Sequence, residues 1–133
     1  MPLPSLIDKA LDAAILPSFT NIGFALRGLE PVETGMDGRR VVITGATSGL
    51  GRSAAATMAG LGATVVLVGR NPDKTAATAD AITSAHPRAS VSTETANLSL
   101  LSEVRSLAGR LNAGPPVDVL VNNAGSLFPE RAE

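Results

Sequence analysis

Eight residues in the first half of the chain have the spacing of a phosphate-binding turn. The segment Thr-Gly-Ala-Thr-Ser-Gly-Leu-Gly occupies positions 44–51, directly after the apolar run 41–43. A turn that opens a helix exposes backbone N–H groups and the positive end of the helix dipole, which together bind anions. Glycines permit a tight exit from the strand and a close backbone approach to a phosphate. A glycine-rich structural turn without a ligand is the alternative. The candidate binding residues are Gly45, Thr47, Ser48, Gly49, Leu50 and Gly51, with Ser48 able to cap the helix or to contact a phosphate.

A second motif, Asn-Asn-Ala-Gly at positions 122–125, leaves another short apolar run, 117–121. Ligands of open parallel sheets bind outside the carboxyl ends of the strands. Asparagine side chains can fix the backbone there, and the small residues leave room for a flat ring. A plain turn without function is the alternative. The second motif adds Asn123, Ala124 and Gly125 to the candidate site.

The elements that would position both motifs alternate between strand and helix, which is typical of a parallel sheet. Right-handed crossovers predict the strand order 3-2-1-4, with the first two crossover helices on one face and the third on the other. Asn71 and Pro72 begin the second helix, and Ser99 is expected to cap the third, whose buried stripe would be Leu100, Leu101, Val104, Leu107, Ala108 and Leu111. The predicted strands are 41–44, 64–68, 89–95 and 117–121, and the first two helices are 50–60 and 72–85.

Over residues 38–125 both motifs resemble those of the classical short-chain dehydrogenase/reductase family. The resemblance implies an α/β, Rossmann-type doubly wound parallel sheet, a nicotinamide cofactor and hydride transfer between that cofactor and an alcohol or carbonyl group. It also implies a catalytic Ser and a Tyr-x-x-x-Lys pair beyond the second motif. The sequence contains no tyrosine, and its only lysines, Lys9 and Lys74, precede that motif. No catalytic residue is therefore assigned, and the chain alone is expected to be inactive, as an incomplete oxidoreductase.

Two other interpretations stay open: a noncatalytic dinucleotide-binding or interaction module, and a decayed gene product without function. A module would fold stably and bind the nucleotide without turnover, whereas a decayed product would do neither.

Cofactor preference can be predicted at the end of the second strand. NAD-preferring relatives place an acidic residue there for the ribose 2′-OH. This chain has Arg70 instead, whose planar guanidinium suits the 2′-phosphate of NADP, so NADP is predicted over NAD. An unrelated surface arginine is the alternative. Asn97 and Leu98 stand where the family usually has Asp-Leu beside adenine, so adenine contact is expected, with a simple turn asparagine as the alternative.

Composition excludes several other classes of function. The formal net charge is −1, without a basic stripe, which speaks against nucleic-acid partners. The chain has no cysteine and a single histidine, His86, so no metal site is predicted, and His86 is expected to be a solvated turn residue. No apolar run is long enough to span a bilayer and no signal peptide is evident, so a cytoplasmic protein is expected.

The organisation divides into an N-terminal helical extension, 1–37, and the N-terminal half of a nucleotide-binding domain, 38–133. Apolar residues at helical spacing over 3–15 predict an amphipathic helix that packs on the domain or on a partner subunit, with membrane-surface contact as the alternative. The fourth strand has no neighbour on its outer side. An exposed apolar edge favours association, so the isolated chain is predicted to be marginally stable or to self-associate there.

Overall fold

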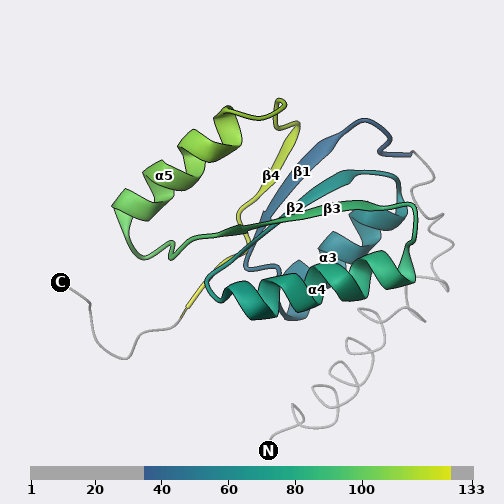
Figure 1. Cartoon of the computed structure of the whole chain (residues 1–133), viewed down its shortest axis with the longest axis horizontal. Helices are drawn as coiled ribbons and strands as arrows, with labels where there is room; N and C mark the ends of the chain where they lie inside the picture. Colours follow the sequence, from purple (N-terminus) through teal and green to yellow (C-terminus); the bar gives the residue numbers. More distant parts are fainter. Residues whose placement is uncertain (1–34, 127–133) are drawn as a thin grey trace, which may run out of the picture. The chain divides into compact units, whose positions relative to one another are not determined.

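The computed structural model of the chain describes residues 35–126, so the predicted N-terminal helix lies outside the described residues. Strands and helices alternate along this range as expected from the periodicity (Figure 1). In chain order the elements are β1 Arg40–Thr44, α3 Gly49–Gly60, β2 Thr64–Gly69, α4 Pro72–Ala85, β3 Ser90–Thr95, α5 Leu101–Asn112 and β4 Val119–Val121.

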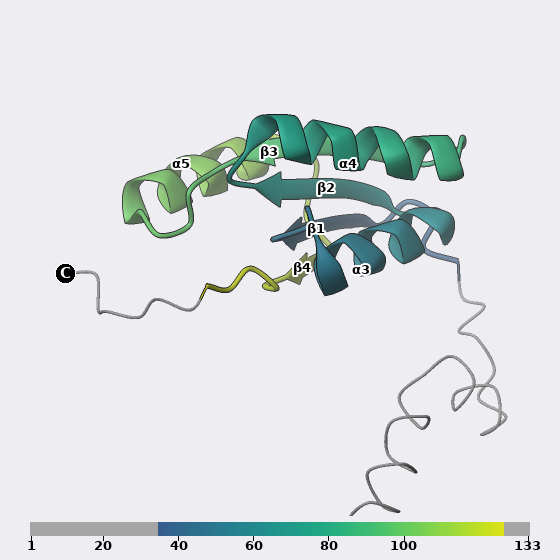
Figure 2. The ribbon, with the colours of Figure 1, turned by 90° about the horizontal axis from the view of Figure 1, so that it is seen from below.

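The strands form one parallel sheet in the order β3-β2-β1-β4, which confirms the predicted topology. Val42 of β1 lies opposite Val66 of β2 on one side and Leu120 of β4 on the other. Figure 2, turned by 90°, shows the strands in this order with β4 at one edge. Because all strands run the same way, their carboxyl ends lie at one end of the sheet, where both sequence motifs follow.

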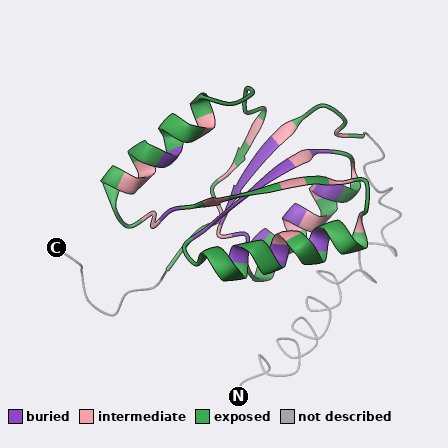
Figure 3. Cartoon of the chain, viewed as in Figure 1, coloured by how far each residue is buried: buried purple, intermediate pink, exposed green. Residues whose placement is uncertain are grey.

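Successive strand residues point to opposite faces, and each face has its own core. On one face, Val41 and Ile43 of β1 pack with Ala55 of α3 and Ile82 of α4. On the other, Val42 packs with Val66 and Val68 of β2, with Ala96 after β3 and with Leu107 of α5. Figure 1 shows α3 and α4 on one side of the strands and α5 on the other, as predicted. The central strands are the most buried part of the described chain (Figure 3).

The ends of α3 and α4 follow the expected capping rules. The Asn71 side chain accepts a hydrogen bond from the Lys74 N–H at 2.9 Å, and Pro72 is the first residue of α4. Gly62, with φ of 94°, follows α3 and donates its N–H to the Ala59 carbonyl at 3.1 Å. These local signals confirm the predicted cap of α4 and the glycine that ends α3.

The prediction for α5 was wrong at its beginning. The helix begins at Leu101 after Leu100, and Ser99 does not cap it. Instead the Asn97 side chain accepts the Ser99 N–H at 3.2 Å, and Glu103 accepts the Asn97 N–H at 2.6 Å. This turn delays the start of the helix, and the buried stripe is narrower than predicted. Only Leu107 of that stripe is buried, whereas Val104 and Leu111 are half-buried and Leu100, Leu101 and Ala108 are exposed.

Strand β4 is shorter than predicted because Asp118 is used for a different contact. Its carboxylate accepts the Arg40 N–H at 2.8 Å and the Arg39 guanidinium at 3.0 Å. The Arg40 backbone hydrogen bond, with the Arg39 hydrogen bond next in importance, lowers the pKa of the Asp118 carboxyl below its ordinary value. The Arg40 guanidinium donates to the carbonyls of Leu111 and Pro115. Two adjacent arginines thus tie the α5–β4 connection to the start of β1.

Candidate nucleotide-binding site

The loop after β1 depends on glycines at two crowded positions. Gly45 has φ of 66°, a left-handed conformation that side chains rarely adopt, and its N–H donates to the Val68 carbonyl at 3.0 Å. A Cβ atom on Gly45 would lie 2.8 Å from the Ala124 Cα, and one on Gly51 would overlap the Gly45 carbonyl oxygen. The absence of side chains therefore lets α3 begin directly against the strand that precedes it, as the sequence predicted.

The N-terminus of α3 keeps its hydrogen-bond donors available. The first N–H groups of a helix have no intrahelical acceptor, and here they belong to the exposed residues Ser48, Gly49 and Leu50 together with Gly51. Ser48 stands at the N-cap position without a side-chain cap hydrogen bond, so of its two predicted roles only phosphate contact stays a prediction. The first turn contains no acidic residue. Gly49 has φ of 51° with open space where a Cβ would stand. This cradle of donors fits a diphosphate.

The hydroxyl of Thr44 joins the two motifs. It donates to the Val121 carbonyl at 3.3 Å and accepts the N–H groups of Asn123 at 3.1 Å and Ala124 at 3.0 Å. Thr44 is buried at the end of β1, so this one oxygen organises the chain as it leaves β4. Thr44 is the first residue of the first motif but was not among the predicted binding residues. Its signal was its place in the motif, directly before Gly45.

Asn123 supplies the reciprocal contact between the motifs. Its side-chain amide donates to the carbonyls of Thr44 at 3.1 Å and Gly45 at 3.2 Å. Asn123 is half-buried, whereas Asn122, Ala124 and Gly125 are exposed. The structure therefore brings the glycine loop and the asparagine motif together at the carboxyl ends of β1 and β4. There they form one continuous surface, which we call the floor of the site.

The other predicted contacts lie at the carboxyl ends of β2 and β3. Arg70 is exposed directly after β2, between the buried Gly69 and the helix cap Asn71. Asn97 and Leu98 are half-buried after β3. Because the Asn97 Oδ1 atom accepts the Ser99 N–H, its turn role is observed. Contact of either residue with adenine stays a prediction.

The other four loop residues lie where the motif placed them. Thr47 is half-buried in the turn before α3, and Ser48, Gly49 and Leu50 are exposed. Leu50 is the most exposed large apolar side chain of the described residues, at 83%. The loop thus presents backbone, small residues and the Leu50 side chain toward solvent, and residues 45–51 carry no charged side chain.

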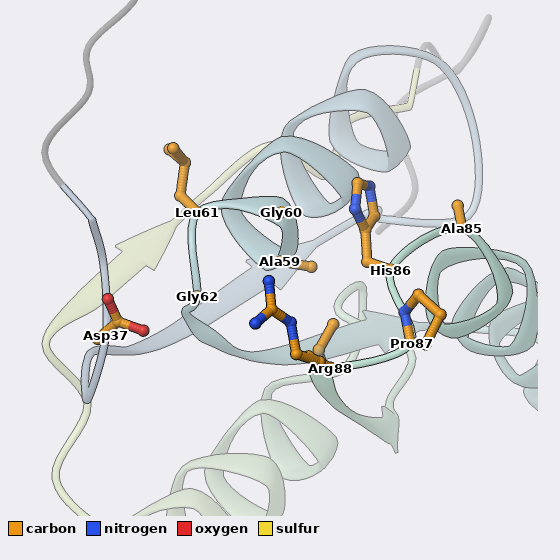
Figure 4. A pocket seen from close by; sticks show the side chains of 10 residues that line it. Asp37, Ala59, Gly60, Leu61, Gly62, Ala85, His86, Pro87 and Arg88 are labelled. Carbon is orange, nitrogen blue, oxygen red and sulfur yellow. The ribbon is translucent and has the colours of Figure 1, made fainter.

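A hollow of about 520 Å³ lies at the other end of the sheet (Figure 4). Its lining comes from segments that precede β1, β2 and β3, including Asp37, Gly62 and Arg88. The carboxyl-end motifs do not reach it. His86, expected as a solvated turn residue, is instead half-buried at the C-cap of α4, and a Cβ on Gly60 would lie 3.0 Å from its Cε1 atom.

Residues 35–126 carry neither a metal cluster nor a membrane-spanning helix. In this part of the chain, no group of three or more His, Cys, Asp or Glu side chains could hold a metal ion. Nor does any helix there have the length and hydropathy needed to cross a membrane.

Comparison with known sequences identifies relatives over the same region. DnrU of Streptomyces sp. (strain C5) is 43% identical over 99 residues, covering 73% of this chain and 34% of DnrU. Polyprenol dehydrogenase of Mus musculus is 37% identical over 109 residues, covering 77% of this chain and 31% of the relative. The chain thus spans about a third of the length of these relatives.

Solved structures match the fold and share sequence. The Pseudomonas aeruginosa RhlG/NADP complex is 30% identical, with a TM-score of 0.66, and the match covers 78% of this chain and 40% of RhlG. An Escherichia coli CFT073 protein complexed with NADPH is 36% identical, with a TM-score of 0.65, over 73% of this chain and 41% of that protein. Residues 39–133 match the family model described as short chain dehydrogenase. On this match, and with both motifs joined through Thr44 and Asn123, the chain belongs to the short-chain dehydrogenase family.

Proposed function

We propose that the chain is the cofactor-binding portion of an NADP-dependent oxidoreductase that moves hydride between NADP(H) and an alcohol or carbonyl substrate. The observation that carries this proposal is the joining of two motifs, through Thr44 and Asn123, beside the open N-terminus of α3. NADP or NADPH in related structures supports the choice of cofactor.

The residues of this chain bind and orient the cofactor in the proposal. The N–H groups at the start of α3 hold the diphosphate, and the missing side chain of Gly49 lets it approach the backbone. Ala124 and Gly125 border the nicotinamide end, where bound NADPH supplies the hydride. Asn97 and Leu98 border adenine. Acid–base catalysis commonly contributes about 10²- to 10⁴-fold, and no residue of this chain is assigned to it.

Arg70→Ala tests the cofactor assignment. We expect the affinity for NADP to fall by about 1.5–3 kcal/mol, because a charged hydrogen bond to the 2′-phosphate is lost. NAD lacks this phosphate, so its affinity should hardly change. Equilibrium dialysis of the whole chain with each nucleotide measures both values. Arg88→Ala removes an exposed arginine at the other end of the sheet and serves as the control. Equal losses for NADP and NAD would remove Arg70 from the site.

A noncatalytic dinucleotide-binding module is the second candidate, because the two joined motifs need only bind the dinucleotide. Because the chain alone is expected to be inactive under either function, the encoding message separates them. An open frame that continues into a Tyr-x-x-x-Lys segment would support the oxidoreductase. A stop codon after Glu133, together with tight nucleotide binding, would support the module.

We also propose that the chain self-associates through β4. The strand pairs only with β1 among the described strands, which leaves its other backbone edge free. Leu120 is 55% exposed beside the buried Val42. An unpaired edge with an apolar side chain is a template for another strand. Leu120→Lys should therefore shift sedimentation from dimer toward monomer, whereas Leu101→Lys, which changes an exposed leucine of α5, should not. A wild-type chain that sediments as a monomer at every concentration would refute this interface.

A further inference from the structure

The end of β2 is crowded at the residue directly before Arg70. Gly69 is buried, and a Cβ atom built on it would overlap Thr75 Oγ1 and lie 3.0 Å from the Thr47 Cγ2. Thr75 belongs to the first turns of α4, and Thr47 belongs to the phosphate-binding loop. Three segments thus meet at Gly69: the strand that leads to Arg70, the helix that follows it and the loop of the first motif.

The backbone on both sides of Arg70 is held in place. Before it, the Gly69 carbonyl accepts the Ala96 N–H at 3.1 Å. After it, the Asn71 carbonyl accepts both the Thr75 hydroxyl at 2.7 Å and the Thr75 N–H at 3.1 Å. Thr75 is fully buried, so its hydroxyl has little freedom to move. The Arg70 backbone therefore stands between two anchored residues, while its side chain is exposed.

We infer that Gly69 and Thr75 are positioning residues for cofactor discrimination, acting through Arg70. Because Gly69 has no side chain, α4 can dock against β2, and Thr75 can then fix the Asn71 carbonyl. This docking fixes the position of the Arg70 backbone, from which its side chain extends, relative to the loop that binds the diphosphate. A charged hydrogen bond depends steeply on distance and angle, so a fixed backbone favours the 2′-phosphate in particular. The inference rests on the proposed NADP function.

Gly69→Ala is the first test, with binding of NADP and NAD measured separately on the whole chain. The new methyl group must push β2 away from Thr75, because the threonine is buried and hydrogen-bonded. We expect the dissociation constant for NADP to rise about tenfold, since about 1.4 kcal/mol of binding corresponds to that factor. The constant for NAD should rise by less than about threefold. A general loss of structure would raise both constants equally, so the ratio is the informative quantity.

Thr75→Ala supplies the rescue experiment. Removing the hydroxyl and methyl groups deletes the atom that would overlap the new methyl, although Thr47 Cγ2 remains 3.0 Å from it. The double variant should therefore recover part of the preference for NADP over NAD that Gly69→Ala loses. A double-mutant cycle over the wild-type chain, the two single variants and the double variant measures this coupling. Thr75→Ala alone should weaken NADP by about threefold, because Asn71 loses one of its two donors. It provides the measurement if Gly69→Ala does not fold.

Gly109→Ala is the matched control, because this glycine lies in α5 and a Cβ on it would have nothing within 4 Å. It should leave both dissociation constants unchanged. If Arg70→Ala removes NADP discrimination but Gly69→Ala and Thr75→Ala do not, the positioning inference is wrong and the proposed cofactor stands. If the wild-type chain does not discriminate NADP from NAD, both are overturned.

Discussion

Gly45→Ala should destabilise the described fold by about 2–5 kcal/mol, whereas Gly49→Ala should cost only about 1–2 kcal/mol. Both glycines have positive φ, 66° and 51°. They differ in their surroundings, because a Cβ on Gly45 would meet the Ala124 backbone at 2.8 Å while one on Gly49 would meet open space. The larger loss at Gly45 therefore measures the contact between the two motifs. Urea unfolding followed by circular dichroism gives both free energies.

The same pair of variants should separate stability from binding. The open space at Gly49 is where the diphosphate is expected, so a methyl group there should weaken NADP by tenfold or more, roughly the 1.4 kcal/mol that corresponds to that factor. The variant should stay folded under the conditions of the binding measurement. Equal stabilities for the two variants would contradict the crowding at Gly45. Unchanged NADP affinity in Gly49→Ala would contradict the placement of the diphosphate.

Thr44→Val should destabilise the fold by about 2–3 kcal/mol, although valine has nearly the same shape as threonine. The substitution removes the oxygen that accepts the N–H groups of Asn123 and Ala124 and donates to Val121. Each of the three lost hydrogen bonds contributes about 0.5–1.5 kcal/mol, although the Asn123 N–H retains a second acceptor, the Val121 carbonyl at 3.0 Å. NADP and NAD should both bind more weakly, because the floor beneath the nicotinamide end is loosened.

Thr57→Val is the matched control for this measurement. The Thr57 hydroxyl also donates to a carbonyl, that of Ser53 at 3.0 Å, but it is exposed on α3. Its loss should change the stability by less than about 0.5 kcal/mol. Similar effects of the two substitutions on the free energy of unfolding would show that the Thr44 hydroxyl has no special role in joining the motifs.

Local patterns were sufficient for the topology and for most of the helix ends. The apolar strands and alternating helices predict a parallel sheet, and the right-handed crossover rule combined with the doubly wound order of the family that the motifs resemble gives β3-β2-β1-β4. Asn71, Pro72 and Gly62 act through their immediate neighbours, so their roles could be predicted without tertiary information. The glycine loop could be predicted for the same reason, because a strand, a turn and a helix are consecutive in the chain.

Contacts between distant residues could not be predicted in this way. Serine is a favourable N-cap residue by type. Here, however, the Asn97 side chain accepts the Ser99 N–H and the Glu103 carboxylate accepts the Asn97 N–H, which holds residues 97–99 in a turn. Leu100 and Leu101 are exposed because they lie at the N-terminal end of α5, whereas burial is confined to the stripe of Val104, Leu107 and Leu111. The crowding at Gly69 and the hydrogen bonds at Thr44 could not be predicted, because they arise only when the fold places Thr75 and Asn123 against these residues. Sequence spacing alone carries no information on such crowding.

The weak burial of α5 has a consequence for which part of the fold opens first. Within the described chain this helix contributes only Leu107 to the fully buried set, and its ends are held by exposed polar contacts such as Arg110 to Glu94 at 2.8 Å. Segments with few buried apolar groups open locally at a lower free energy than the global transition. Fluctuations that detach α5 would uncover the face of the sheet that carries Val42 and Val66, while the face covered by α3 and α4 stays packed. The contact between the glycine loop and Asn123 would outlast this opening, because Thr44 and Asn123 bond to each other without any atom of α5.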